Sequence, residues 1–142
     1  MQNLTVKENT LTPEEFTSLF KSAGWGEPPL MQIEVALKNS IRTFSLYENE
    51  KLVGMGRLVG DSAMEFFLRD FVIAPDCQKH GYGKFLLSYI ESFIKKQLQP
   101  GWTAKFQLMS AQGKEGFYKK CGFEILPNEK RGAGVHKDIC GE

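Results

Sequence analysis

The sequence is poor in cysteine and in long apolar runs, and each shortage excludes a class of protein. Its three cysteines, Cys77, Cys121 and Cys140, lie too far apart in the chain to form a metal-ligand pair. No apolar run approaches the roughly 18 residues of a membrane span. The first ten residues, MQNLTVKENT, lack the apolar core of a secretory signal. We therefore expect a cytoplasmic protein with reduced thiols, no metal and no membrane contact.

The chain also has little net charge, +1 over 142 residues, which argues against a nucleic-acid partner. The charges are nevertheless unevenly distributed. Residues 1–71 carry seven Lys and Arg against ten Asp and Glu, whereas residues 72–142 carry eleven against seven. The second half thus has a net charge of +4, and this excess predicts an anionic ligand there.

A hydrophobic content of 42% is enough for one core, and we expect a single domain over residues 1–142. Thr12-Pro13-Glu14-Glu15 combines a capping threonine, a proline at the first helical position and a capping-box glutamate. This pattern predicts a helix that ends near Gly24. Apolar residues at helical spacing predict a second short helix around residues 30–37.

From residue 41 onward the apolar period changes to that of strands, and further elements follow in turn. Two strands joined at residues 48–51, a third at 63–75, a helix at 85–98 and a strand at 104–109 are predicted. A short helix at 114–120 and a strand pair at 123–126 and 135–139 complete the chain. The expected fold is α/β (α+β), with a mixed, mostly antiparallel central sheet flanked by helices in the order β-α-α-β-β-β-α-β-α-β-β.

The segment Gln78-Lys79-His80-Gly81-Tyr82-Gly83-Lys84 connects a predicted strand to a predicted helix. Glycines at such a junction let backbone N–H groups approach an anion at the positive end of the helix dipole. A dinucleotide fingerprint would need a glycine at position 86, which is Leu86. A P-loop would need glycine at position 78 and a hydroxyl residue at 85, which is Phe85. Neither motif fits.

The spacing Gln-x-x-Gly-x-Gly resembles the pyrophosphate loop of the GCN5-related N-acetyltransferase (GNAT) superfamily. A second segment, Gly116-Phe117-Tyr118-Lys119-Lys120-Cys121-Gly122-Phe123, resembles the family's recurrent Phe/Leu-Tyr-x-x-x-Gly-Phe. The two matches follow in the family's order, each in its expected structural setting.

The resemblance implies that acetyl-coenzyme A is the acetyl donor. Its pyrophosphate would be bound by the backbone N–H groups of Lys79, His80, Gly81, Tyr82, Gly83 and Lys84, and Gln78 would open the turn. The pantetheine arm would pair like an extra strand with the backbone of Phe71, Val72 and Ile73. The family often places an Asn near position 112 to contact pantetheine, and Ser110 and Gln112 are the available replacements here.

Tyr118 matches the family position whose phenol acts as general acid toward the departing thiolate. Glu65, Asp70 and water remain alternatives for the base that deprotonates the amine. Strict alternation would place Glu65 and Asp70 on opposite faces of one strand unless a bulge resets the phase. Outside catalysis, Glu65 would be a solvated carboxylate and Asp70 a buried, paired one next to Arg69.

We expect an acetyltransferase that acts on a primary amine, first of all that of a small molecule. A protein or peptide amine and a non-catalytic coenzyme A-binding regulatory module are the alternatives. The sequence leaves open whether the protein is a homodimer.

Overall fold

The computed structural model describes residues 3–142, which divide into two compact units. The first ends at Leu108 and the second is Met109–Glu142. The first contains nine elements in chain order: β1 (Leu4–Glu8), α1 (Pro13–Ser22), α2 (Leu30–Lys38), β2 (Arg42–Glu48), β3 (Lys51–Gly60), β4 (Glu65–Ile73), the 3-10 turn η1 (Pro75–Cys77), α3 (Tyr82–Gln97) and β5 (Lys105–Leu108).

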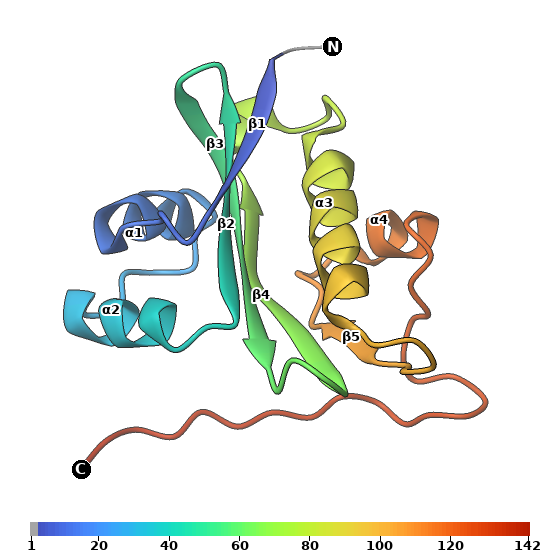
Figure 1. The fold of residues 1–142 in the computed structure, drawn as a ribbon. Helices are drawn as coiled ribbons and strands as arrows, with labels where there is room; N and C mark the ends of the chain where they lie inside the picture. Colours follow the sequence, from blue (N-terminus) through green and yellow to red (C-terminus); the bar gives the residue numbers. More distant parts are fainter. Residues whose placement is uncertain (1–2) are drawn as a thin grey trace. The chain divides into compact units, whose positions relative to one another are not determined.

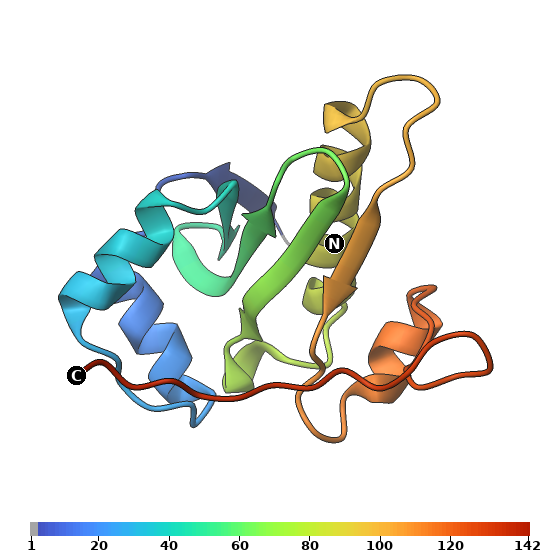
Figure 2. The same cartoon turned by 90° about the horizontal axis from the view of Figure 1, so that it is seen from below.

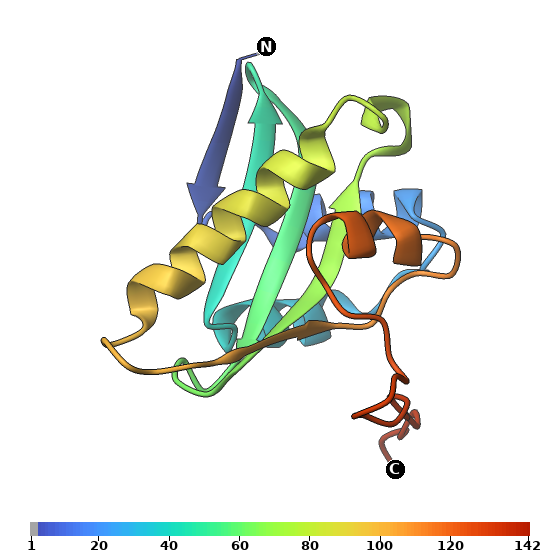
Figure 3. The ribbon, with the colours of Figure 1, turned by 90° about the vertical axis from the view of Figure 1, so that its right-hand side faces the viewer.

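The five strands form one sheet in the order β1-β2-β3-β4-β5 (Figures 1 and 3). The pairs β1/β2, β2/β3 and β3/β4 are antiparallel. β5 runs parallel to β4, as it must after the crossover through α3. The predicted fold class and the meander of β2, β3 and β4 are therefore confirmed.

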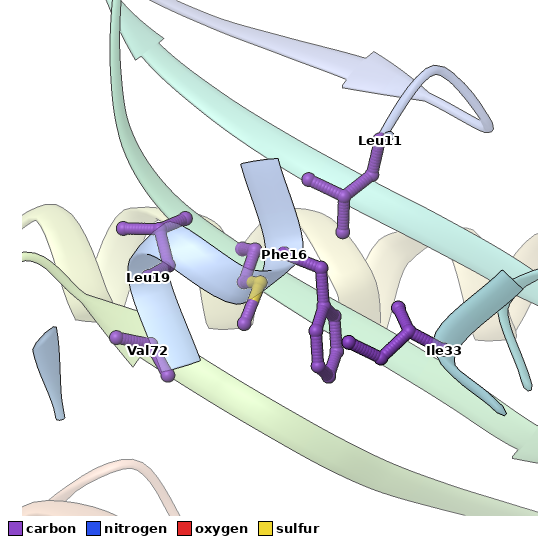
Figure 4. Close-up of a cluster of buried hydrophobic side chains, with 6 residues drawn as sticks. Leu11, Phe16, Leu19, Ile33 and Val72 are labelled. Carbon is purple, nitrogen blue, oxygen red and sulfur yellow. The ribbon is translucent and has the colours of Figure 1, made fainter. Parts of the chain in front are cut away.

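Helices cover both faces of this sheet, with α1 and α2 on one face and α3 on the other (Figure 2). On the α1/α2 face, an apolar cluster joins the two helices to β3 and β4 (Figure 4). It consists of Leu11, Phe16, Leu19, Ile33, Met55 and Val72, each at most 7% exposed. On the other face, the Phe44 ring of β2 meets the Phe93 ring of α3 edge-on at 5.4 Å.

The first helix begins as its sequence predicts. The Thr12 hydroxyl accepts a hydrogen bond from the Glu15 N–H at 3.1 Å, and the Glu15 carboxylate accepts one from the Thr12 N–H at 3.0 Å. This reciprocal capping box satisfies two backbone donors that the helix itself leaves unpaired. Gly24, just past the helix, has a φ of 79°.

The β3–β4 turn depends on Gly60. Its φ is 145°, and a Cβ at this position would overlap the carbonyl oxygen of Glu65. Beside it, the Asp61 carboxylate accepts backbone N–H groups of Ala63, Met64 and Glu65 at 2.8 to 2.9 Å. These hydrogen bonds lower the pKa of Asp61. The turn is thus closed by one glycine and one carboxylate.

The second unit contains the helix α4 (Glu115–Lys120), followed by Gly122 at a φ of 97°. The strand pair predicted at 123–126 and 135–139 is wrong, because neither segment forms a strand. Val135 and Ile139 are 92% and 88% exposed, so their alternation buries no face. Gly132 and Gly134 directly precede the second segment and disfavour extended pairing.

No helix within residues 3–142 is both long and apolar enough to cross a membrane.

Candidate active site

The loop between β4 and α3 leaves the sheet at Ile73 and passes through η1. The Gln78 side-chain amide donates a hydrogen bond to the Ile73 carbonyl oxygen at 3.0 Å. This bond ties the first residue of the motif back to the last residue of the strand. The glutamine therefore shapes the start of the loop.

Two residues of this loop have left-handed backbone conformations. The φ of Lys79 is 67° and that of Gly81 is 83°. In a turn, left-handed residues direct neighbouring N–H groups toward one side, and this arrangement favours anion binding. The side chains of Lys79 and Lys84 are exposed beside these groups and add positive charge.

The N-terminus of α3 lacks the groups that normally satisfy a helix start. Gly81 is the N-cap and offers no side chain, and the first turn contains no acidic residue. In α1, by contrast, Thr12, Glu14 and Glu15 serve this end of the helix. The first-turn N–H groups of α3 and the positive end of its dipole are thus available to an external anion.

β4 contains a bulge immediately before its last three residues. Arg57 of β3 pairs with Arg69, but Met55, two positions earlier, pairs with Val72, so β4 has one extra residue. Leu68 and Phe71, three positions apart, both lie within 3.4 Å of where a Gly56 side chain would begin, on the α3 face. The register of β4 with β5 ends at Leu68 and Leu108. The last residues of β4 therefore continue past the ladder with β5.

The bulge changes the position of the predicted base Asp70. Its φ is 54°, and its carboxylate accepts a hydrogen bond from Arg57 Nε at 2.8 Å. The two side chains are only 12% and 17% exposed. Because Arg57 lies on the same face of β3 as Met55, Asp70 points to the α1/α2 face. Strict alternation from Glu65 would have placed it on the α3 face, and the bulge resets the phase.

Glu65 is exposed at the opposite end of β4, where its carboxylate accepts a hydrogen bond from Gln107 Nε2 at 2.9 Å. The structure therefore separates the two predicted carboxylates along the strand. Each has a partner of its own.

Tyr118 lies in the second unit, on α4, and is 8% exposed. Its ring meets those of Phe117 and Phe123 edge-on at 5.1 and 5.8 Å. Burial, with a smaller contribution from Cys121, raises the pKa of Tyr118 to about 12. The phenol is therefore protonated at neutral pH, as a proton donor must be. In the same unit, the Ser110 hydroxyl donates to the Ala111 carbonyl oxygen at 2.8 Å, and Gln112 is exposed.

A groove also runs along α3, between that helix and Glu8 of β1. It is lined by Gly81, Lys84, Ser88, Tyr89, Ser92 and Lys96, among others, and by no residue of β4. The groove is therefore distinct from the end of β4. In residues 3–142, no three His, Cys, Asp or Glu side chains gather in a way that could hold a metal ion.

Two residues beside the predicted site were not singled out from the sequence. Arg57 could have been noticed, because an arginine between buried strand positions usually has a buried acidic partner. Glu48, whose carboxylate accepts a hydrogen bond from the Tyr82 hydroxyl, gave no signal. It belongs to an ordinary polar turn, and only the folded chain brings it to the loop.

Comparison with known proteins identifies the family that this chain resembles. The family model described as acetyltransferase (GNAT) domain matches residues 39–125. An uncharacterized N-acetyltransferase, ycf52, of Pyropia yezoensis is 34% identical over 122 residues, covering 83% of this chain and 68% of the relative. A soybean (Glycine max) protein named histone acetyltransferase TAP1 is 30% identical over 83% of this chain, which spans 54% of that relative.

Among solved structures, a Staphylococcus aureus protein described as a probable acetyltransferase superposes with a TM-score of 0.81. It is 26% identical in sequence, and the match covers 96% of this chain and 99% of that one.

Proposed function

Because the chain belongs to the GNAT acetyltransferases, we propose that it transfers the acetyl group of acetyl-coenzyme A to the primary amine of a small molecule. The amine attacks the donor directly while both are bound. Residues 1–142 act as a single N-acetyltransferase domain, and its three free thiols suit the cytoplasm.

One observation carries the proposal: α3 begins without a cap, directly after a loop with two left-handed residues. A 16-residue helix with unpaired first-turn donors is a favourable anion site. The residues present fit the donor's diphosphate, since the backbone of Lys79 to Lys84 supplies N–H groups and two lysines supply charge. Gln78 fixes the entry to the loop.

The edge of β4 would hold the pantetheine arm. The ladder with β5 ends at Leu68, so Phe71, Val72 and Ile73 lie beyond it. Amide groups of a ligand can pair with a strand edge by the geometry of a β-ladder. Binding along this edge would direct the thioester toward the bulge.

Acetyl-coenzyme A supplies the acetyl group as an activated thioester; the chain supplies orientation and proton transfer. Tyr118 is the proposed general acid, and its phenol donates a hydrogen bond to the sulfur as the carbon–sulfur bond breaks. Its pKa of about 12 makes complete transfer to a free thiolate unfavourable. The phenol therefore acts mainly by hydrogen bonding to the charge that develops on sulfur.

The base is Glu65, Asp70 or water. Asp70 is engaged by the Arg57 guanidinium, which favours a structural role for this carboxylate. Glu65 is exposed and far along β4 from the loop. Water is the candidate that requires neither carboxylate to leave its partner.

A protein amine is the second candidate acceptor, and the name of the soybean relative, histone acetyltransferase, favours it. A non-catalytic coenzyme A-binding module is the alternative in another class. A screen of small amines and lysine peptides with acetyl-coenzyme A, scored by free thiol release, separates these outcomes. Thiol release with small amines is expected. Tight donor binding without release by any amine would favour the binding module.

The role of Tyr118 is tested by Tyr118→Phe, which keeps the ring and its packing. General acids typically contribute about 10²–10⁴-fold. We expect kcat to fall at least about 10-fold while the donor dissociation constant changes less than about 3-fold. Unchanged turnover in this variant would show that Tyr118 only packs.

The role of the loop is tested by Gly83→Val. A side chain at this position would obstruct backbone approach to the diphosphate. Acetyl-coenzyme A should raise the Tm of the parent by mass action, and most of that shift should disappear in the variant. Gly116→Val in the other unit is the control for a generic glycine effect, because open space surrounds a Cβ there. A full Tm shift in folded Gly83→Val would contradict the proposed loop role.

A further inference from the structure

The proposed diphosphate loop is attached to the rest of the sheet by the tip of the β2–β3 hairpin. Glu48, the last residue of β2, pairs with Lys51, the first of β3. The Glu48 carboxylate accepts a hydrogen bond from the Tyr82 hydroxyl, and Lys51 Nζ lies 3.3 Å from Asp76 Oδ2. One hairpin thus contacts the connection at two points: Asp76, before the anion-binding residues, and Tyr82, among them.

The contact with Tyr82 is the stronger anchor. Lys51 and Asp76 have side chains that are 62% and 72% exposed, and exposed ion pairs contribute little. Tyr82, by contrast, is 5% exposed and is the one buried side chain among residues 78–84. The His80 ring also lies 5.6 Å from its ring. The loop therefore reaches the protein interior through Tyr82.

An anchor of this kind matters because, beyond the Gln78–Ile73 hydrogen bond at its start, the loop is held mainly by backbone geometry. Lys79 and Gly81 occupy left-handed conformations, and α3 starts without a side-chain cap. N–H groups that are fixed before binding lose less conformational entropy when an anion binds. Preorganisation of the loop therefore lowers the dissociation constant. Tyr82 is the first residue of α3, and fixing its hydroxyl fixes the first-turn N–H groups next to it.

We propose that Glu48 is a positioning residue for the acetyl donor: its carboxylate holds the Tyr82 hydroxyl and thereby sets the anion-binding loop. This inference rests on the proposed function. Glu48 itself would not touch the donor. Its negative charge would repel a diphosphate, so its benefit must come from accepting the hydrogen bond and not from charge.

The same helix provides a matched control. Tyr89, seven residues after Tyr82, donates a hydrogen bond to the Glu8 carboxylate of β1. Both pairs join a tyrosine of α3 to a carboxylate of a strand, and each hydrogen bond raises the pKa of its tyrosine, that of Tyr82 to about 12. Only the Tyr82 pair reaches the loop.

The test measures the dissociation constant of coenzyme A by calorimetry, which requires no turnover. Tyr82→Phe and Glu48→Ala should weaken binding about 3- to 10-fold, the effect of losing one hydrogen bond. Glu48→Gln keeps an acceptor without the charge and should restore the parent value. Tyr89→Phe should lower the Tm comparably and leave binding unchanged.

Hydrogen exchange of the 79–84 amides without ligand provides an independent readout, and it should accelerate in Tyr82→Phe but not in Tyr89→Phe. If Tyr82→Phe and Glu48→Ala bind coenzyme A as the parent does, this inference is overturned but the proposed function is not. Equal weakening by Tyr82→Phe and Tyr89→Phe would have the same consequence. A parent that binds no coenzyme A would instead overturn the proposed function, and the inference with it.

Discussion

At the scale of single residues, Tyr118 has a proposed chemical role and is also expected to make the fold less stable in alkaline solution. Burial raises its pKa from 10.0 to about 12, because the phenolate would have to form away from water. In the unfolded chain the phenol ionises near its ordinary value. The folded state therefore holds this proton over a pH range in which the unfolded state has lost it.

This difference predicts a loss of stability at high pH. The contribution of Tyr118 is fully present below pH 10.0 and is lost as pH rises through about 12. Within that window, the free energy of unfolding should fall by up to about 1.4 kcal/mol per pH unit for this group. Denaturant titrations should show a shallower decline for Tyr118→Phe than for the parent. Parallel slopes in the two proteins would contradict the raised pKa.

At the scale of elements, β4 is divided by its bulge. It pairs with β3 on both sides of the bulge, whereas its pairing with β5 ends at Leu68, before the bulge. The extra residue allows the Asp70 carboxylate to reach Arg57. This mostly buried ion pair joins β4 to β3 at the bulge. A carboxylate in this position stabilises the strand whether or not it also takes a proton.

Asp70→Asn separates these two roles. Asparagine tolerates the left-handed conformation at φ 54°, so the bulge should persist. Loss of the charge should lower the free energy of unfolding by about 1–3 kcal/mol. If water is the base, kcat of the folded variant should stay within about 3-fold of the parent, whereas loss of a general base would cost about 10²-fold or more. Glu65→Gln is the control, expected to change stability little because Glu65 is exposed.

The elements also show which parts of the fold were predictable. The capping box of α1, the period of α3 and the glycine loop are local patterns, and local patterns survive in the structure. The bulge is not local, since it arises from pairing with β3 across the sheet. The strand pair at 123–126 and 135–139 failed for a similar reason: alternation predicts a strand only if a partner and a buried face exist. Glu48 and Tyr82 meet only in the folded chain, 34 residues apart in sequence.

At the scale of the whole molecule, side chains from residue 128 to the end of the chain are all exposed. Arg131 still contacts this unit, through a 3.1 Å ion pair with Glu124 and backbone bonds with Asn128. Beyond Arg131, His136 Nδ1 lies 3.8 Å from the Asp138 carboxylate, and both side chains are exposed. Residues 132–142 thus contribute little buried area to the folded chain.

Removal of residues 132–142 should therefore be nearly neutral. The Tm of the shortened chain should lie within about 1 °C of the parent, because surface segments without buried contacts contribute little to stability. Differential scanning calorimetry measures this directly. A fall of more than about 5 °C would mean that Val135 and Ile139 are buried in solution. Analytical ultracentrifugation of the full and shortened chains would then show whether a second copy covers them.

Gly60 has a consequence for how the enzyme's activity would be mapped by mutagenesis. Any side chain at this position meets the Glu65 carbonyl, so every substitution removes folded protein. In a saturation library selected for activity, substitutions of Gly60 would be depleted as thoroughly as substitutions of Tyr118, although Gly60 has no proposed role in the reaction. A parallel selection for cellular abundance distinguishes them, since Gly60 variants disappear from both libraries and Tyr118→Phe from the activity library alone.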